Sequence, residues 1–192
     1  MKPAKTRLFL AALAILVATG CGAASGRPSD ADFNVSNSSS VVVLGVSPAM
    51  RLRAYPGWSD GAQWQQNKLA KATINAGPED GYVVVQMAPT LKGEGYGILR
   101  VIPSLATVLT VCTGGSTAVF EVPADSVVYV GDLRLTEGAE YEVEVGYDFA
   151  KATAFMKRTY PALAARLTKG KAKVAKVTNG QCDGEPVSFV GK

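Results

Sequence analysis

From residue 40 onward the chain is a succession of short apolar runs, and this feature constrains its fold more than any other. The runs are rich in Val, Ile, Leu and Tyr, and Gly, Pro, Asn or Ser separates each from the next. Such runs are typical of β-strands, because branched and aromatic side chains fit a pleated surface whereas Gly and Pro favour turns. We expect strands at 40–46, 49–54, 81–88, 95–102, 106–112, 117–122, 126–131 and 139–147.

The arrangement of these runs predicts how the strands pack. Apart from one longer gap, successive runs begin about 8 to 15 residues apart, with turn residues between them, a spacing typical of β-sandwiches and barrels. The "TGGS" stretch at 113–116 predicts a tight hairpin. We expect one domain over 40–192: an antiparallel β-sandwich, immunoglobulin-like or prealbumin-like.

One C-terminal helix is expected at about 148–168. Asp148 is suited to cap its first turn. Pro161 removes a backbone donor from the middle, so we expect a kink or two short helices meeting near Thr159. The "KAKVAKV" stretch that follows suits an edge strand protected by lysines. The apolar face of the helix comprises Phe149, Ala152, Met156, Leu163 and Leu167.

The N-terminal segment has the features of a targeting signal and not of a folded domain. Three basic residues precede an 11-residue apolar run at 8–18, which is too short to span a bilayer and suits a secretory signal peptide. The "VATGC" that follows resembles the lipobox of bacterial lipoproteins, although Ala18 stands where Leu is commonest. The resemblance implies a signal peptide at 1–20, a lipid on Cys21 and a flexible tether over 21–39. Ordinary secretion, with cleavage further on and loss of Cys21, is the alternative.

That resemblance also implies a location. A lipid on Cys21 places the protein in the cell envelope, and Gly22 in place of Asp favours the outer membrane, facing the periplasm or the cell surface. The remaining cysteines, Cys112 and Cys182, are then expected to form a disulfide in this oxidising compartment. The bridge closes a loop of about 70 residues, which the chain-entropy model values at roughly 4 kcal/mol.

The chain contains no histidine, which excludes histidine-based triads and histidine-ligated zinc. Three widely spaced cysteines have no metal-ligand spacing, so we expect no metal, no cofactor and no enzymatic activity. Removal of residues 1–20 leaves 17 basic side chains against 16 acidic ones, and this balance gives no indication of nucleic-acid binding. Basic residues gather within 151–176; we expect them to pack beside acidic strands or, alternatively, to face an anionic envelope surface.

A candidate binding segment lies at 55–80, the longest stretch without strand character. It holds Tyr55, Trp58, Asp60 and Trp64, and aromatic faces beside a carboxylate are typical of sugar-binding surfaces. The competing interpretation is that the tryptophans plug the end of the sandwich. If they bind ligand, a carbohydrate- or peptidoglycan-binding or -hydrolysing protein is the alternative function.

A second resemblance concerns the globular part. The stretches "FEVPADSVVYVGDLRL" and "YPALAARL" are similar to parts of uncharacterised bacterial lipoproteins with small β-sandwich domains. That family implies no catalytic residues. The preferred hypothesis is a non-enzymatic binding or structural module, tied to the membrane by its lipid, with an envelope protein or polysaccharide as its partner.

Overall fold

Strands dominate the structure, and a helical segment lies near the C-terminus, as predicted. The computed structural model describes residues 28–138 and 140–192. The helices are η1 (Asp30–Asp32), α1 (Phe149–Thr159) and α2 (Pro161–Ala164). The strands are β1 (Ser40–Ser47), β2 (Arg51–Asp60), β3 (Gln63–Gln66), β4 (Ile74–Ala76), β5 (Tyr82–Met87), β6 (Glu94–Ser104), β7 (Thr107–Thr110), β8 (Ser116–Phe120), β9 (Val127–Glu137), β10 (Tyr141–Gly146), β11 (Leu167–Lys169), β12 (Lys173–Val177) and β13 (Glu185–Gly191).

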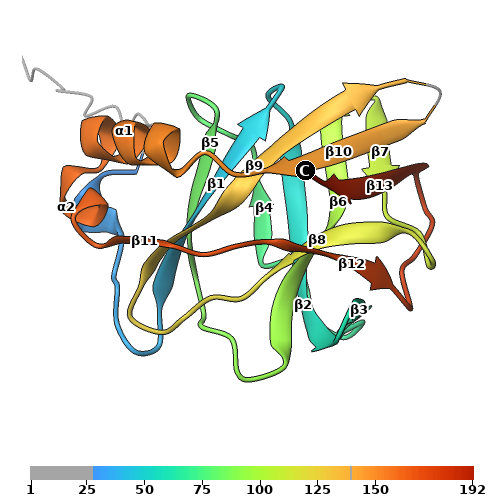
Figure 1. Cartoon of the computed structure of the whole chain (residues 1–192), viewed down its shortest axis with the longest axis horizontal. Helices are drawn as coiled ribbons and strands as arrows, with labels where there is room; N and C mark the ends of the chain where they lie inside the picture. Colours follow the sequence, from blue (N-terminus) through green and yellow to red (C-terminus); the bar gives the residue numbers. More distant parts are fainter. Residues whose placement is uncertain (1–27, 139) are drawn as a thin grey trace, which may run out of the picture.

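Five strands close into a small barrel, in the order β2, β3, β12, β8, β6 and back to β2. In Figure 1 these strands occupy the lower right of the molecule. Closure is possible because β2 and β6 are long, and a register shift after Arg53 bends the ladder between them. The TGGS hairpin prediction is wrong, since β7 and β8 do not pair with each other and instead lie one after the other along the edge of β6 that β2 leaves free.

Six of the remaining strands form an outer sheet in the order β5, β1, β9, β10, β13, with β11 beside the first residues of β9. Strands β4 and β7 pair instead with β2 and β6 of the barrel. The pairs β1–β9, β10–β13 and β11–β9 are parallel. The prediction of purely antiparallel pairing is therefore wrong, because the chain traverses the barrel strands between β1 and β9 and returns in the same direction. Strand β13 also pairs with β7 and so joins the outer sheet to the barrel side.

Strand β1 of the outer sheet is buried on both faces. On β1, Val42 and Leu44 contact the main core between the sheet and the barrel. Val41 and Val43, on the opposite face, contact a second core beneath α1 and α2. Burial on both faces explains why β1 is a nearly continuous apolar run rather than an alternating one.

The predicted helix is two short helices. The Asp148 carboxylate accepts a hydrogen bond from Lys151 N at 3.0 Å, so Asp148 caps α1 as expected. Pro161 begins α2, directly after the break at Tyr160. Helix ends at Ala164, earlier than predicted, because Leu167 belongs to β11 instead.

Strand β12 contains most of the predicted lysine-protected edge, and here the prediction is wrong. It pairs with β8 on one side and β3 on the other, inside the closed barrel. Its lysines, Lys173 and Lys176, are exposed, and Ala175 and Val177 are buried. The alternation marks a barrel wall with a wet outer face.

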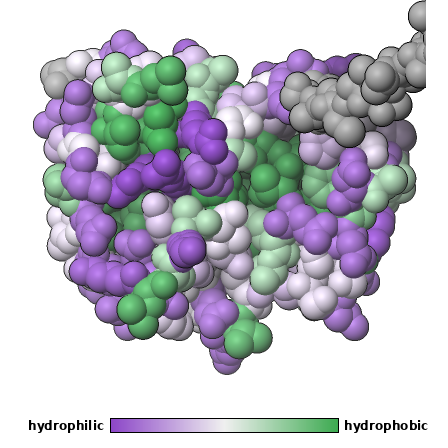
Figure 2. Space-filling model, turned by 180° about the vertical axis from the view of Figure 1, so that it is seen from behind, coloured by the Kyte–Doolittle hydropathy of each residue, from purple (hydrophilic) through white to green (hydrophobic). Residues whose placement is uncertain are grey.

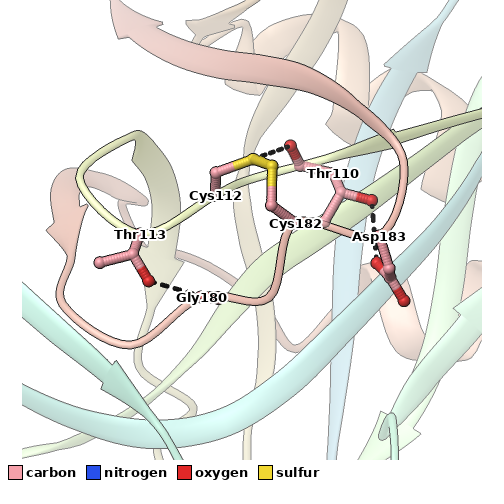
Figure 3. Close-up of a disulfide and its surroundings, with 6 residues drawn as sticks. All are labelled: Thr110, Cys112, Thr113, Gly180, Cys182 and Asp183. Carbon is pink, nitrogen blue, oxygen red and sulfur yellow. Dashed lines mark hydrogen bonds between the residues drawn. A yellow bond between two sulfur atoms is a disulfide. The ribbon is translucent and has the colours of Figure 1, made fainter.

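A disulfide joins Cys112 to Cys182, as predicted, with a Cα–Cα distance of 4.7 Å and a sequence separation of 70. Figure 3 shows it linking the turn after β7 to the loop before β13. The Thr113 hydroxyl donates to the Gly180 carbonyl at 2.7 Å beside the bridge. The disulfide therefore holds β13 of the outer sheet next to β7 on the barrel side.

The first described residues pack against the domain. Asp30 accepts hydrogen bonds from the backbone N–H groups of Ala162 and Leu163, and the rings of Phe33 and Tyr160 meet edge to face at 5.7 Å. Cys21 and the predicted signal peptide lie outside the described residues. Within residues 28–138 and 140–192, no helix is long and apolar enough to cross a membrane.

Candidate functional site

Half of the predicted binding segment at 55–80 is strand, including all four candidate residues. Tyr55, Trp58 and Asp60 belong to β2, and Trp64 belongs to β3, which pairs with the end of β2 as a hairpin. Strand propensity there was concealed by Gly, Pro and polar residues. The four candidate side chains are therefore held by a rigid hairpin, and alternation along its strands decides which of them reach solvent.

Trp64 is fully buried inside the barrel. Its ring fills a slot left by two glycines: a Cβ atom added at Gly57 or Gly97 would lie 2.6 or 2.7 Å from it. The indole N–H donates to the Gly95 carbonyl at 3.4 Å. The prediction that Trp64 contributes to a binding surface is wrong, because the ring is core packing, as in the plug interpretation.

The other three predicted residues differ in exposure. Trp58 is 49% exposed, and Asp60 is also exposed. Tyr55 is half-buried and packs against the main core. The structure thus keeps Trp58 and Asp60 as surface residues and brings neither together with Trp64 at a shared surface.

Two leucines that sequence reasoning missed lie on neighbouring loops. Leu69, between β3 and β4, is 98% exposed, and Leu91, between β5 and β6, is 73% exposed. Their loops meet beside Trp58, since Asn67 and Thr90 line the same small hollow of about 70 Å³ as Trp58 does. Figure 2 shows isolated apolar residues projecting among hydrophilic ones at the lower rim of the molecule. We call Trp58, Leu69 and Leu91 the barrel-end surface.

Lysines flank this barrel-end surface. Lys68, Lys71 and Lys92 are all exposed and adjoin the two leucines in the "NKLAK" and "TLKG" stretches. Glu94 nearby is half-buried and accepts a hydrogen bond from Leu91 N at 3.0 Å. A large apolar residue beside lysine in a turn segment was the signal that could have identified both loops.

A second feature is a polar hollow of about 650 Å³ on the outer sheet, where α1 begins. Tyr82, Gly45, Asp132 and Gly146 form one cross-strand row over β5, β1, β9 and β10. The Asp132 carboxylate lies over Gly45, since a Cβ atom there would collide with its Oδ1. We call the region around this row the polar hollow; its charged lining comprises Asp80, Asp132, Arg134, Asp148 and Lys151.

Hydrogen bonds fix the Asp132 carboxylate in place. The Tyr129 hydroxyl donates to Oδ2 in a short hydrogen bond, and Asp148 N donates to the same oxygen at 2.8 Å. Asp148 N also lies 3.0 Å from the Tyr129 hydroxyl oxygen. The strand positions of Tyr129 and Asp132 are adjusted by Gly131, whose φ of 139° accompanies a bulge. Asp132 is therefore a fixed carboxylate within strand β9.

The tyrosines of the polar hollow remain protonated. Burial and the hydrogen bond to Asp132 raise the pKa of Tyr129 far above its usual value. Burial, followed by the nearby Asp132 and Asp148 charges, raises the pKa of Tyr82 to about 12 against the opposing effect of Arg158. Neither phenol is available as a general base near neutral pH.

The arrangement offers binding groups rather than a metal centre. Among the described residues, no cluster of three or more Asp, Glu, Cys or His side chains could hold a metal ion. Comparisons with family models, with curated proteins and with solved structures find no match. The geometry of the two features therefore carries the functional argument.

Proposed function

We propose that the protein is a lipid-anchored, non-enzymatic binding module of the bacterial cell envelope that docks an envelope protein through its barrel-end surface. The observation that carries this proposal is the exposure of Trp58 on strand β2 and of Leu69 and Leu91 on two loops that both reach the hollow lined by Trp58. Large apolar side chains that remain in water on one part of a surface are typical of interaction sites.

The chemistry of the barrel-end surface favours a protein partner. Leucine side chains offer apolar area and no hydrogen-bonding groups, so they suit a hydrophobic pocket better than a polysaccharide. Trp58 adds the kind of aromatic anchor that contributes most at protein interfaces. Lys68, Lys71 and Lys92 supply a positive rim that complements acidic side chains on the partner. The burial of Trp64 removes one of the two tryptophans on which the carbohydrate alternative depends.

The proposed anchor and the barrel-end surface are compatible in position. The first described residues lie against α2, whereas β3 lies at the opposite side of the molecule in Figure 1. A lipid on Cys21 then leaves the barrel-end surface pointing away from the membrane. The lipobox-like sequence supports the anchor, and the absence of histidine from the chain supports a non-enzymatic role.

Photo-crosslinking in cells that produce the full chain tests the docking proposal. A photoreactive phenylalanine analogue replaces Leu69 or Leu91, and Leu105 is the matched control, because it is a leucine on the β6–β7 turn that is at least as exposed as either. We expect the same discrete protein adduct at positions 69 and 91 and none at 105. Equal adducts at all three positions, or adducts at none, contradict the proposal.

Mass spectrometry of the membrane-extracted protein tests the anchor separately. We expect a chain that begins at Cys21 and carries added acyl mass. An unmodified chain that begins further on, recovered from a soluble fraction, contradicts the lipid anchor and leaves the docking result unaffected.

A further inference from the structure

A second binding site follows from Tyr82, which is only 5% exposed and lines the polar hollow. Its ring stacks on Phe155 of α1, with ring centroids 4.2 Å apart. Its buried hydroxyl has no hydrogen-bond partner among residues 28–138 and 140–192. Leaving such a group unpaired costs about 1 to 3 kcal/mol, so a hydroxyl in this state beside a large hollow indicates a ligand.

Two carboxylates, of Asp132 and Asp148, line the same hollow as Tyr82. Both donors to Asp132 reach Oδ2, and Oδ1 lies over Gly45, next to Tyr82 in the cross-strand row. Asp148 receives its capping hydrogen bond on Oδ1. Asp132 Oδ1, Asp148 Oδ2 and the Tyr82 hydroxyl together offer three oxygen acceptors, the number that a primary ammonium group requires.

The rest of the lining limits the ligand further. Arg134 and Lys151 face the hollow beside these carboxylates, together with Asp80, so the site holds both signs of charge. A simple polyamine would meet the two basic side chains unfavourably, whereas a zwitterion complements both. A hollow of about 650 Å³ accommodates several linked residues rather than one amino acid.

We propose that the polar hollow binds a short zwitterionic peptide, with its ammonium group held by Asp132, Asp148 and Tyr82 and its carboxylate directed toward Arg134 and Lys151. This site is distinct from the barrel-end surface and does not depend on the protein partner proposed above. Its occupant is a small molecule, so the protein combines a docking surface on the barrel with a ligand site on the outer sheet.

Calorimetric titration of the purified protein with four probes tests this ligand class. Trialanine carries both charges, N-acetyl-trialanine lacks the ammonium group, trialanine amide lacks the carboxylate, and maltotriose is a neutral polyol of similar size. We expect trialanine to bind, trialanine amide to bind more weakly, and the other two probes not to bind. No binding of trialanine, equal binding of the acetylated peptide, or preference for maltotriose overturns the proposal.

Two conservative variants connect the binding to the named atoms. Tyr82→Phe removes only the hydroxyl, and Asp132→Asn removes the charge while keeping an oxygen that can accept from Tyr129. Each is expected to weaken trialanine binding by about 10- to 100-fold, the effect of losing a hydrogen bond to a charged group. Tyr96→Phe is the control, since its hydroxyl bonds the Ala88 carbonyl outside the hollow. Unchanged affinity in Tyr82→Phe and Asp132→Asn, or an equal loss in Tyr96→Phe, contradicts the assignment.

Discussion

The barrel interior and the polar hollow use glycine in the same way and reach opposite results. In the barrel, Gly57 and Gly97 leave a slot that the Trp64 ring fills completely. On the outer sheet, Gly45 makes room for the Asp132 carboxylate, and the hollow beside it remains open to solvent. The space left by a missing Cβ is filled by an aromatic ring in the barrel, which gives a rigid core. The corresponding space on the outer sheet holds a hydrogen-bonded carboxylate, which lines the proposed binding site.

The difference follows from what surrounds each glycine. The barrel closes on itself, so any space inside it must be filled by apolar atoms to avoid a cavity. The outer sheet is covered by α1 only in part, and the polar start of that helix supplies an N–H donor to Asp132. Substitutions in the barrel interior should therefore lower the free energy of unfolding. Substitutions in the polar hollow should mainly lower the affinity for ligand.

Trp64→Ala is expected to have the largest effect. Removal of the ring leaves a cavity inside the closed barrel, and such substitutions cost about 3 to 5 kcal/mol. Urea unfolding followed by circular dichroism measures the free energy of unfolding. A loss below about 1 kcal/mol would show that the ring does not support the barrel.

Replacement of Cys112 and Cys182 by alanine tests the disulfide that links the barrel side to the outer sheet. Loss of a disulfide that closes a loop of this length costs about 2 to 4 kcal/mol. The same unfolding measurement, on oxidised protein and on the double variant, gives the difference. Equal free energies of unfolding for the two proteins would contradict a stabilising role for this disulfide.

Gly57→Ala should destabilise the barrel by about 2 to 3 kcal/mol. The new Cβ would lie 2.2 Å from the backbone oxygen of Gln65, which cannot move without disturbing the β2–β3 pairing. Thermal unfolding provides the measurement. A variant as stable as the parent would mean that this part of the barrel is looser than the contacts indicate.

Gly45→Ala makes the matching change in the polar hollow, with a smaller expected loss of about 1 to 2 kcal/mol. The added Cβ meets the end of a side chain, so the Asp132 carboxylate can rotate away and lose its bonds to Tyr129 and Asp148 N. We expect trialanine binding to be abolished while the fold is kept. A larger loss of stability than that of Gly57→Ala reverses the comparison.

The smallest expected effect is a pH dependence at Tyr82. Its pKa is raised from 10.0 to about 12 by burial and by neighbouring carboxylates, so the folded state keeps the phenolic proton more tightly than the unfolded state does. The stabilisation is complete below pH 10 and is lost as the pH rises through about 12. Unfolding of the parent protein at increasing alkaline pH should lose stability more steeply than that of Tyr82→Phe. Parallel slopes would argue against a perturbed phenol.

Much of the strand content was predictable, because apolar runs such as β1 and β9 are buried on one or both faces. The short strands β3, β4 and β11 were not, since three or four residues of mixed polarity give no periodic signal. The spacing of the runs is typical of sandwiches and of barrels, and the choice of a sandwich missed the closed barrel, because pairing between distant strands leaves no mark on local pattern. The disulfide was predictable once the lipobox resemblance set Cys21 aside, because Cys112 and Cys182 were then the remaining pair.

The candidate sites likewise include residues that the sequence predicted and residues that it did not. Trp58 was identified because aromatic residues in a polar segment are conspicuous. The polar hollow was missed because Tyr82 and Asp132 lie 50 residues apart and become neighbours only through the pairing of β5, β1 and β9. Trp64 was assigned to the surface because alternation along β3 is visible only once its pairing with β2 is known.

The central observation is that Trp64 is buried whereas Trp58 is exposed. Iodide quenching of tryptophan fluorescence tests this difference directly. In Trp58→Phe the remaining emission comes from Trp64, which the barrel encloses, so iodide should leave it almost unquenched. The parent protein, with Trp58 exposed, should be quenched substantially. If iodide quenches Trp58→Phe as strongly as the parent, then Trp64 is not in a closed barrel and the contrast between a filled core and an open hollow is wrong.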